Sequence, residues 1–213
     1  MPAPKIKICG ISTAESVDAV IAARAETFGL VFYAPSPRNV SMAQAALLGA
    51  RSAHRIARVG LFVDGNDALI AEAIAAAGLD ALQLHGSESP ERAAQVKAQF
   101  GLPVWKAIAV AAPGDVERAA DYTGAADLIL FDAKTPKGTL PGGMGLSFDW
   151  SLLAAWKNRA AWGLAGGLTP ENVTEAIRTT SAGLVDTSSG VESAPGIKDV
   201  DKIAAFLKAT ASL

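Results

Sequence analysis

The sequence has a single cysteine, Cys9, among its 213 residues. An internal disulfide is therefore excluded, and a lone thiol is compatible with a reducing compartment. Long hydrophobic runs are also lacking, because the longest run of Ala, Ile and Leu, from Ala68 to Leu79, is too short for a membrane span and contains Glu72. The first four residues lead straight into an apolar strand, without the core of a signal peptide. We expect a soluble, cytoplasmic protein.

Charged residues are few and nearly balanced. They make up 19% of the chain, the formal net charge is -2, and no cluster of lysine and arginine stands out. Binding to nucleic acid is therefore not expected, although a few local cations could meet an anionic small molecule. No spacing of His, Asp and Glu resembles a metal site, and no Ser-His-Asp motif is present.

Half of the residues are hydrophobic, and they form short apolar runs that alternate with Ala-rich segments. The runs are continuously apolar, as in Leu128 to Phe131, which is typical of parallel strands covered on both faces. We predict strands near residues 5–9, 28–32, 57–63, 80–84, 103–107, 127–132, 160–165 and 183–186. Helices are predicted at about 14–25, 42–53, 67–77, 89–100, 114–121, 149–157, 170–179 and 199–210.

About eight strand–helix units in this length predict a closed (β/α)₈ barrel, a TIM barrel of parallel strands that forms one domain over residues 1–213. The alternative is an open doubly wound sheet, but no G-x-G-x-x-G follows the first strand. Ser12 or Thr13 and Ser41 are candidate helix caps, and Thr169-Pro170-Glu171 predicts a helix with proline at its first position. The Gly- and Pro-rich segment from Lys134 to Ser147 is expected to be an active-site loop.

Two strand ends provide groups for acid–base chemistry. Cys9 ends the first strand beside Gly10; a free cysteine is usually a small buried hydrophobe, but at this position a thiolate could remove a proton or attack an electrophile. Asp132 ends the sixth strand, where it could cap the next turn or act as a carboxylic acid. We favour the acid, because the long loop that follows would shield the carboxyl and favour its neutral form.

The loops after the seventh and eighth strands are rich in glycine and serine. Such loops let backbone N–H groups and hydroxyls approach an anion, and these two positions are the usual phosphate site of this barrel. Ordinary tight turns are the alternative. The candidate phosphate ligands are Gly166, Gly167, Ser188, Ser189 and Gly190.

Other polar residues at strand ends are candidates for lining the site. Arg38 follows Ser36-Pro37 in a stiff loop, where its planar fork could bind a carboxylate at two points rather than remain solvated. Gln83 and His85 end the fourth strand and Lys106 the fifth; such residues more often fill a hydrogen-bonded core layer than perform catalysis. His54 is expected at the surface.

The motifs, taken in order, resemble the phosphoribosylanthranilate isomerase family over nearly the whole chain. They are Lys7-Ile8-Cys9-Gly10-Ile11, Ser36-Pro37-Arg38, Leu82-Gln83-Leu84-His85-Gly86, the Asp132 segment with Gly142-Gly143-Met144-Gly145, Gly166-Gly167-Leu168-Thr169-Pro170-Glu171-Asn172, and Val185-Asp186-Thr187-Ser188-Ser189-Gly190-Val191-Glu192 with Pro195-Gly196. Small departures from the family pattern are Ser12, Met144 and Thr187.

The resemblance implies an Amadori rearrangement in tryptophan biosynthesis, without cofactor or metal, on the small molecule phosphoribosylanthranilate. Asp132 would be the acid and Cys9 the base, while Arg38 would hold the anthranilate carboxylate and Asp186 the sugar hydroxyls. The resemblance implies no obligate protein partner, and it does not distinguish a monomer from a dimer.

Three alternatives stay open. One is another sugar-phosphate isomerase or epimerase, and a second is an enzyme that also accepts the related histidine-pathway intermediate. The third is a non-catalytic barrel that binds a phosphate ligand.

Overall fold

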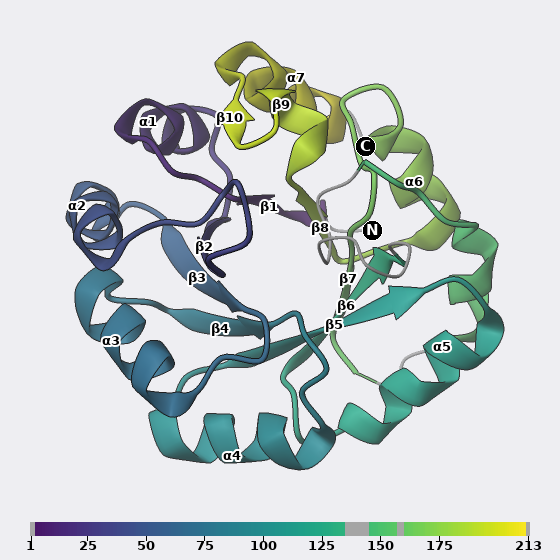
Figure 1. Ribbon diagram of the computed structural model, residues 1–213. Coiled ribbons are helices and arrows are strands. Elements are labelled where there is room, and N and C mark those ends of the chain that lie inside the picture. Colours follow the sequence, from purple (N-terminus) through teal and green to yellow (C-terminus); the bar gives the residue numbers. More distant parts are fainter. Residues whose placement is uncertain (1–2, 135–144, 157–159, 212–213) are drawn as a thin grey trace.

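The computed structural model describes residues 3–134, 145–156 and 160–211, and these form a closed barrel of parallel strands (Figure 1). Each strand is hydrogen-bonded to the next one in the sequence. The strands are β1 (Lys5–Cys9), β2 (Thr27–Phe32), β3 (Ala57–Phe62), β4 (Ala81–Leu84), β5 (Val104–Val110), β6 (Leu128–Ala133), β7 (Trp162–Leu164) and β8 (Leu184–Thr187).

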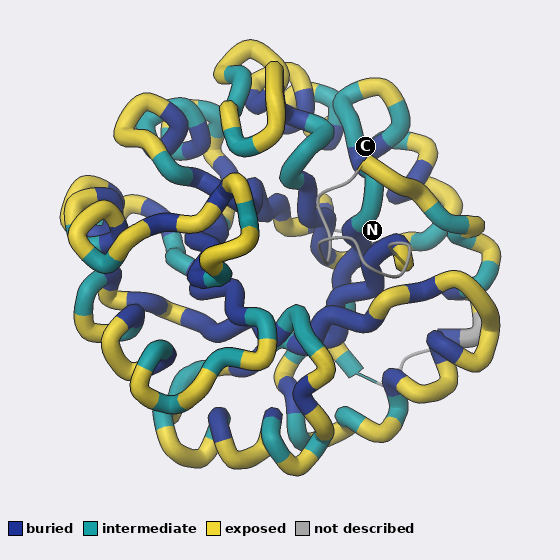
Figure 2. Tube along the Cα trace, viewed as in Figure 1, coloured by how far each residue is buried: buried dark blue, intermediate teal, exposed yellow. Residues whose placement is uncertain are grey.

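The pairing of β1 with β8 closes the sheet. The two strands are parallel, with a register that runs from Lys5 opposite Leu184 to Ile8 opposite Thr187. This pairing confirms the predicted barrel and excludes the open doubly wound sheet. Figure 2 shows the buried strands inside and helices that expose only their outer faces. The continuous apolar runs are explained by this double coverage.

Helices surround the strands (Figure 1). They are α1 (Ala14–Ala22), α2 (Met42–Ser52), α3 (Asp67–Ala77), α4 (Pro90–Phe100), α5 (Pro113–Arg118), α6 (Val173–Thr180) and α7 (Val200–Thr210), with a 3-10 helix η1 (Ala119–Tyr122) after α5. The predicted caps are confirmed, since the Thr13 side chain accepts a hydrogen bond from the Ser16 backbone and Ser41 accepts one from Gln44.

Two predicted helices differ in the structure. The segment predicted at 149–157 forms the 3-10 helix η2 (Trp150–Ala155). Its large side chains recur every three residues, at Trp150, Leu153 and Trp156, and this period places them on one face of a 3-10 helix. The helix predicted from Pro170 begins only at Val173, because the Asn172 side chain bonds back to the preceding loop instead of leaving that turn helical.

A small hairpin follows β8 on the catalytic side of the barrel. It consists of a 3-10 turn η3 (Ser189–Val191), β9 (Glu192–Ala194) and β10 (Ile197–Lys198), which pair antiparallel. The hairpin packs on the loop after β2 at Gly196, where φ is +82° and a β-carbon would lie 2.5 Å from the Pro37 carbonyl oxygen. The chain after β8 is thereby held beside Arg38.

The predicted active-site loop, Lys134 to Ser147, lies mostly outside the described residues. It stays a prediction.

Candidate active site

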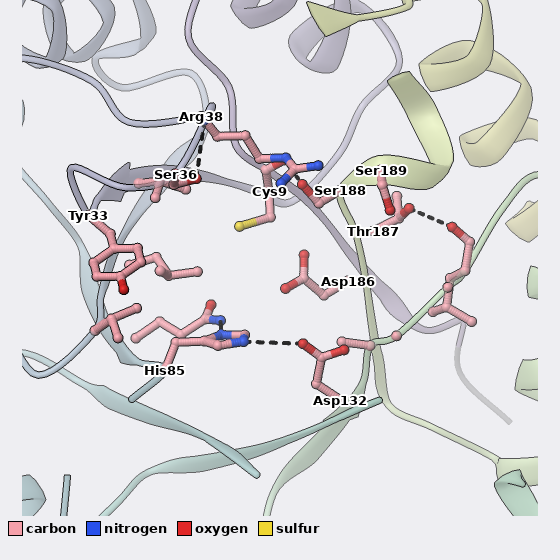
Figure 3. Close-up of a pocket in the computed structure, with 18 residues that line it drawn as sticks. Cys9, Tyr33, Ser36, Arg38, His85, Asp132, Asp186, Thr187, Ser188 and Ser189 are labelled. Carbon is pink, nitrogen blue, oxygen red and sulfur yellow. Dashed lines mark hydrogen bonds and ion pairs between the residues drawn. The ribbon is translucent and has the colours of Figure 1, made fainter. Parts of the chain in front are cut away.

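A cavity of about 710 Å³, counting the part open to solvent, lies at the C-terminal ends of the strands (Figure 3). Such a volume is typical of small-molecule sites. Ten of the predicted site residues line it: Cys9, Arg38, Gln83, His85, Asp132, Gly166, Gly167, Asp186, Ser188 and Ser189. Residues from six different strand ends or following loops therefore converge on one space.

The proposed acid is held by a histidine. His85 Nε2 lies 3.2 Å from Asp132 Oδ2, while the backbone N–H of Ala133 donates to Asp132 Oδ1 at 2.8 Å. The other ring nitrogen of His85 lies 3.0 Å from the amide nitrogen of Gln83. The three side chains form one chain of contacts along the cavity wall, so Asp132 has a fixed orientation.

The thiol lies on the opposite side of the cavity from Asp132, with the Asp186 carboxyl between them (Figure 3). Cys9 is buried, and this burial raises the pKa of its thiol, although the nearby Lys7 ammonium opposes the rise. A sulfur and a carboxyl that face one space can move protons at two points of one substrate.

Asp186 is paired on one side and open on the other. Its Oδ2 accepts a bond from Lys7 Nζ at 2.7 Å, whereas its buried Oδ1 has no hydrogen-bond partner among the described residues. Burial raises the pKa of this carboxyl despite the attraction of Lys7. A buried oxygen without a partner at a cavity wall is suited to accept a hydrogen bond from a ligand hydroxyl.

Arg38 binds a carboxylate at two points, but that carboxylate belongs to the protein. Its Nε and Nη2 donate to the two oxygens of Glu192, each at 2.8 Å, and Lys198 Nζ donates to Glu192 Oε1 at 2.7 Å. The predicted two-point grip is therefore already used within the chain. Arg38 also lines the cavity.

Glu192 was missed from the sequence, because nothing in the pattern indicates that the hairpin returns to the loop after β2. Burial alone would raise the pKa of Glu192, but the bonds from Arg38 and Lys198 outweigh it and lower that pKa. Glu192 holds the Arg38 guanidinium in place. Because the two cations Arg38 and Lys198 surround one carboxylate, these three side chains together keep a net positive charge.

The glycine loop after β7 is tightly fixed. Gly166 and Gly167 have φ of +88° and +62°, and a β-carbon at Gly166 would lie 2.5 Å from the Ala133 nitrogen. The Asn172 side chain accepts a bond from the Thr169 backbone and donates to the Gly167 carbonyl. This loop is therefore preformed.

The loop after β8 is tied to its neighbours by hydroxyls. Ser188 Oγ donates to the Cys9 carbonyl at 3.0 Å, and Thr187 Oγ1 donates to the Leu168 carbonyl at 2.7 Å. Thr187 is one of the departures from the family pattern, and here its hydroxyl joins the two loops of the predicted phosphate site.

Two predicted residues do not line the cavity. A β-carbon at Gly190 would lie 1.9 Å from the Leu168 carbonyl oxygen, so this glycine permits close packing of two loops. Lys106 is not among the lining residues and donates to Glu88 Oε2 at 2.8 Å and to the Gly86 carbonyl at 2.7 Å. Lys106 therefore holds the loop after β4. His54 is exposed, as expected.

An apolar wall of the cavity was also missed. Val31, Tyr33, Leu61 and Val63 line the cavity at the ends of β2 and β3. They belong to continuous apolar runs, in which sequence alone does not distinguish side chains that face the cavity from those that face the helices. This wall can cover the faces of an aromatic ring.

Among the described residues, no group of His, Cys, Asp and Glu could hold a metal ion, and no helix has the length and apolar character needed to cross a membrane.

Comparisons with known proteins agree with this geometry. The family model described as N-(5'-phosphoribosyl)anthranilate (PRA) isomerase matches residues 6–209. An N-(5'-phosphoribosyl)anthranilate isomerase from Paracoccus denitrificans is 52% identical over 213 residues, which cover 99% of each chain.

Solved structures give the same result. A phosphoribosyl anthranilate isomerase from Thermotoga maritima has a TM-score of 0.89 at 36% identity, covering 99% of this chain and 100% of the other. Another such enzyme, in complex with reduced 1-(o-carboxyphenylamino)-1-deoxyribulose 5-phosphate, has a TM-score of 0.87 at 34% identity, with the same coverage. The chain belongs to the N-(5'-phosphoribosyl)anthranilate isomerase family.

Proposed function

We propose that this protein converts N-(5′-phosphoribosyl)anthranilate into 1-(2-carboxyphenylamino)-1-deoxyribulose 5-phosphate, with Cys9 and Asp132 as the acid–base pair. One observation carries the proposal. The two groups lie on opposite sides of one cavity, which is also lined by a buried arginine and by preformed Gly/Ser loops.

The first step is opening of the ribose ring. Asp132 donates a proton to the ring oxygen, the C1–O bond breaks, and the lone pair of the anthranilate nitrogen forms the C=N bond of an iminium. His85 supports this step, because its contact with Asp132 Oδ2 keeps the carboxyl directed along the cavity wall.

The second step is removal of a proton from C2. The Cys9 thiolate takes this proton, and the electron pair of the C–H bond moves into a C1–C2 double bond as the iminium becomes an enolamine. The enolamine then becomes the ketone as C1 gains a proton and the C2 hydroxyl loses its proton. The pathway needs no redox cofactor, because oxidation at C2 and reduction at C1 occur within one molecule.

Two anionic ends fix the substrate. Gly166, Gly167, Ser188 and Ser189 would anchor the phosphate through backbone N–H groups and hydroxyls. Arg38, whose side chain lies close to Ser188, would meet the anthranilate carboxylate, with the apolar wall of Val31, Tyr33, Leu61 and Val63 beside the ring. Asp186 Oδ1 would accept a bond from a sugar hydroxyl between them.

The test is a fluorescence assay of the purified protein. Loss of phosphoribosylanthranilate fluorescence at a rate proportional to enzyme concentration is expected, together with formation of the ketose product. Binding of the reduced product analogue without turnover of the substrate would favour the non-catalytic phosphate-binding barrel instead.

A further inference from the structure

Lys7 is a fully buried cation that the proposed reaction steps do not use. It lies on β1 with an exposed fraction of 0%, directly opposite Asp186 in the register of β1 and β8. Its Nζ donates to Asp186 Oδ2 at 2.7 Å. A buried ammonium is costly unless its charge is compensated, so its position in the barrel requires a reason.

The thiol lies beside this ammonium. Lys7 and Cys9 are two residues apart on one strand and therefore point to the same face of the sheet. Gly29 stands opposite Cys9 on β2, and a β-carbon there would lie 2.8 Å from Cys9 Sγ and 3.2 Å from Lys7 Nζ. The sulfur and the ammonium thus converge on a space that only glycine leaves open.

The charges around the sulfur come from three strands. Lys7 on β1 attracts a thiolate and most strongly opposes the effect of burial on the thiol pKa. Asp186 on β8 repels the thiolate more weakly than Lys7 attracts it, and Lys198 on β10 adds attraction. The facing residue of β2, Gly29, has no charge. The ammonium of Lys7 is also stabilised by both partners, since Asp186 and Cys9 raise its pKa against its burial.

We propose that Lys7 is a positioning residue for Cys9: its ammonium, shared between the sulfur and Asp186, supplies the positive charge that a thiolate needs inside the barrel. The inference rests on the proposed function, in which Cys9 is the base. It also explains Gly29, because any larger residue would separate the sulfur from its counter-ion. When Cys9 takes a proton from C2, the same ammonium remains paired with Asp186.

The test measures the thiol without measuring catalysis. Cys9 is the single cysteine of the chain, so the rate of alkylation by iodoacetamide reports this sulfur alone. In Lys7→Met the rate at pH 8 should fall by about tenfold or more, and the pH profile should move upward by about one unit. Lys106→Met is the matched control. It also removes a buried lysine and breaks the ion pair of that lysine with a carboxylate, but this pair does not involve the sulfur. Its alkylation rate should equal that of the unmodified protein.

An unchanged alkylation profile in folded Lys7→Met would overturn the inference. Slower alkylation with normal isomerase turnover would support the role of Lys7 and refute Cys9 as the base, so the two proposals fail separately.

A second variant covers the case in which Lys7→Met does not fold. In Cys9→Ala the ammonium loses one partner, so the ¹⁵N resonance of Lys7 Nζ should shift while that of Lys106 stays in place. No shift at Lys7 would refute the contact.

Discussion

His85 Nε2 lies 3.2 Å from Asp132 Oδ2, and its other ring nitrogen lies 3.0 Å from the amide nitrogen of Gln83. An amide nitrogen donates, so Nδ1 of a neutral His85 accepts and Nε2 carries the proton that faces Asp132. His85 follows β4 directly, so its contact holds the Asp132 carboxyl of β6 in place relative to β4. In the proposed mechanism we therefore expect His85 to orient Asp132 rather than to act as a base.

Replacing His85 by Ala should lower kcat and leave KM nearly unchanged. Loss of the contact lets the Asp132 carboxyl rotate, and a misplaced catalytic group costs about tenfold to a hundredfold in rate. Steady-state kinetics measure the effect. His54→Ala, at an exposed site, is the control and should keep both constants; a normal kcat in His85→Ala would show that Asp132 needs no support.

Cys9→Ala and Asp132→Asn should each abolish turnover, while each still binds the reduced product analogue. Both changes remove a proton-transfer group and keep the shape of the cavity, so binding and chemistry separate. Calorimetry with the analogue and the fluorescence assay measure the two quantities. Near-normal kcat in either variant would refute the role assigned to that residue.

Arg38→Ala should raise KM more than it lowers kcat, because Arg38 is expected to contact the carboxylate end of the substrate, away from the reacting carbons. Glu192→Gln should act in the same direction but more weakly, because it loosens the guanidinium without removing it. Kinetics over a range of substrate concentrations give both constants. An unchanged KM in Arg38→Ala contradicts the assignment.

Stability should depend on pH through Glu192. Its folded pKa lies below the ordinary value of 4.5, so its ion pairs stabilise the fold above that pH and lose their effect as the pH falls through the folded pKa. Glu192→Gln should cost on the order of 3 kcal/mol near neutral pH, as expected for a broken buried pair, and less at about pH 3.5. The raised pKa of Asp186 changes stability with pH in the opposite direction. Asp186 is present in both proteins, so its effect cancels in the difference between their free energies of unfolding.

Urea unfolding of both proteins over this pH range gives the difference. A difference that does not vary with pH would show that Glu192 makes no ion pair in solution.

Gly166→Ala should weaken substrate binding and destabilise the fold. A β-carbon there would lie 2.5 Å from the Ala133 nitrogen and 3.0 Å from Asp132 Oδ1, at a φ of +88°, and such strain costs about 1–3 kcal/mol. Inhibition by inorganic phosphate and thermal unfolding measure the two effects. Gly114→Ala is the control, because a β-carbon there meets nothing within 4 Å; equal behaviour of the two variants would contradict a preformed phosphate loop.

Strand positions were predictable because parallel strands covered on both faces need continuous apolar runs, and all eight predicted strands appear within a few residues of their expected bounds. Cys9 and Asp132 were predictable for a related reason, since they are polar residues at the ends of such runs. The helix ends at 149–157 and 170–179 were not predictable. They depend on tertiary contacts, such as the edge-on packing of Trp156 on Phe131, and on where the Asn172 side chain bonds.

The sequence by itself determined the order of strands and helices and placed the chemistry-bearing residues at strand ends, because periodicity and turn residues act locally. Only the tertiary structure decided that Glu192, 154 residues away in sequence, holds Arg38, and that Lys7, near Cys9 on β1, bonds to Asp186 on β8. Barrel closure creates these partnerships. Side chains that share one interior must compensate each other's charge, and no local pattern in the sequence records which strands will meet.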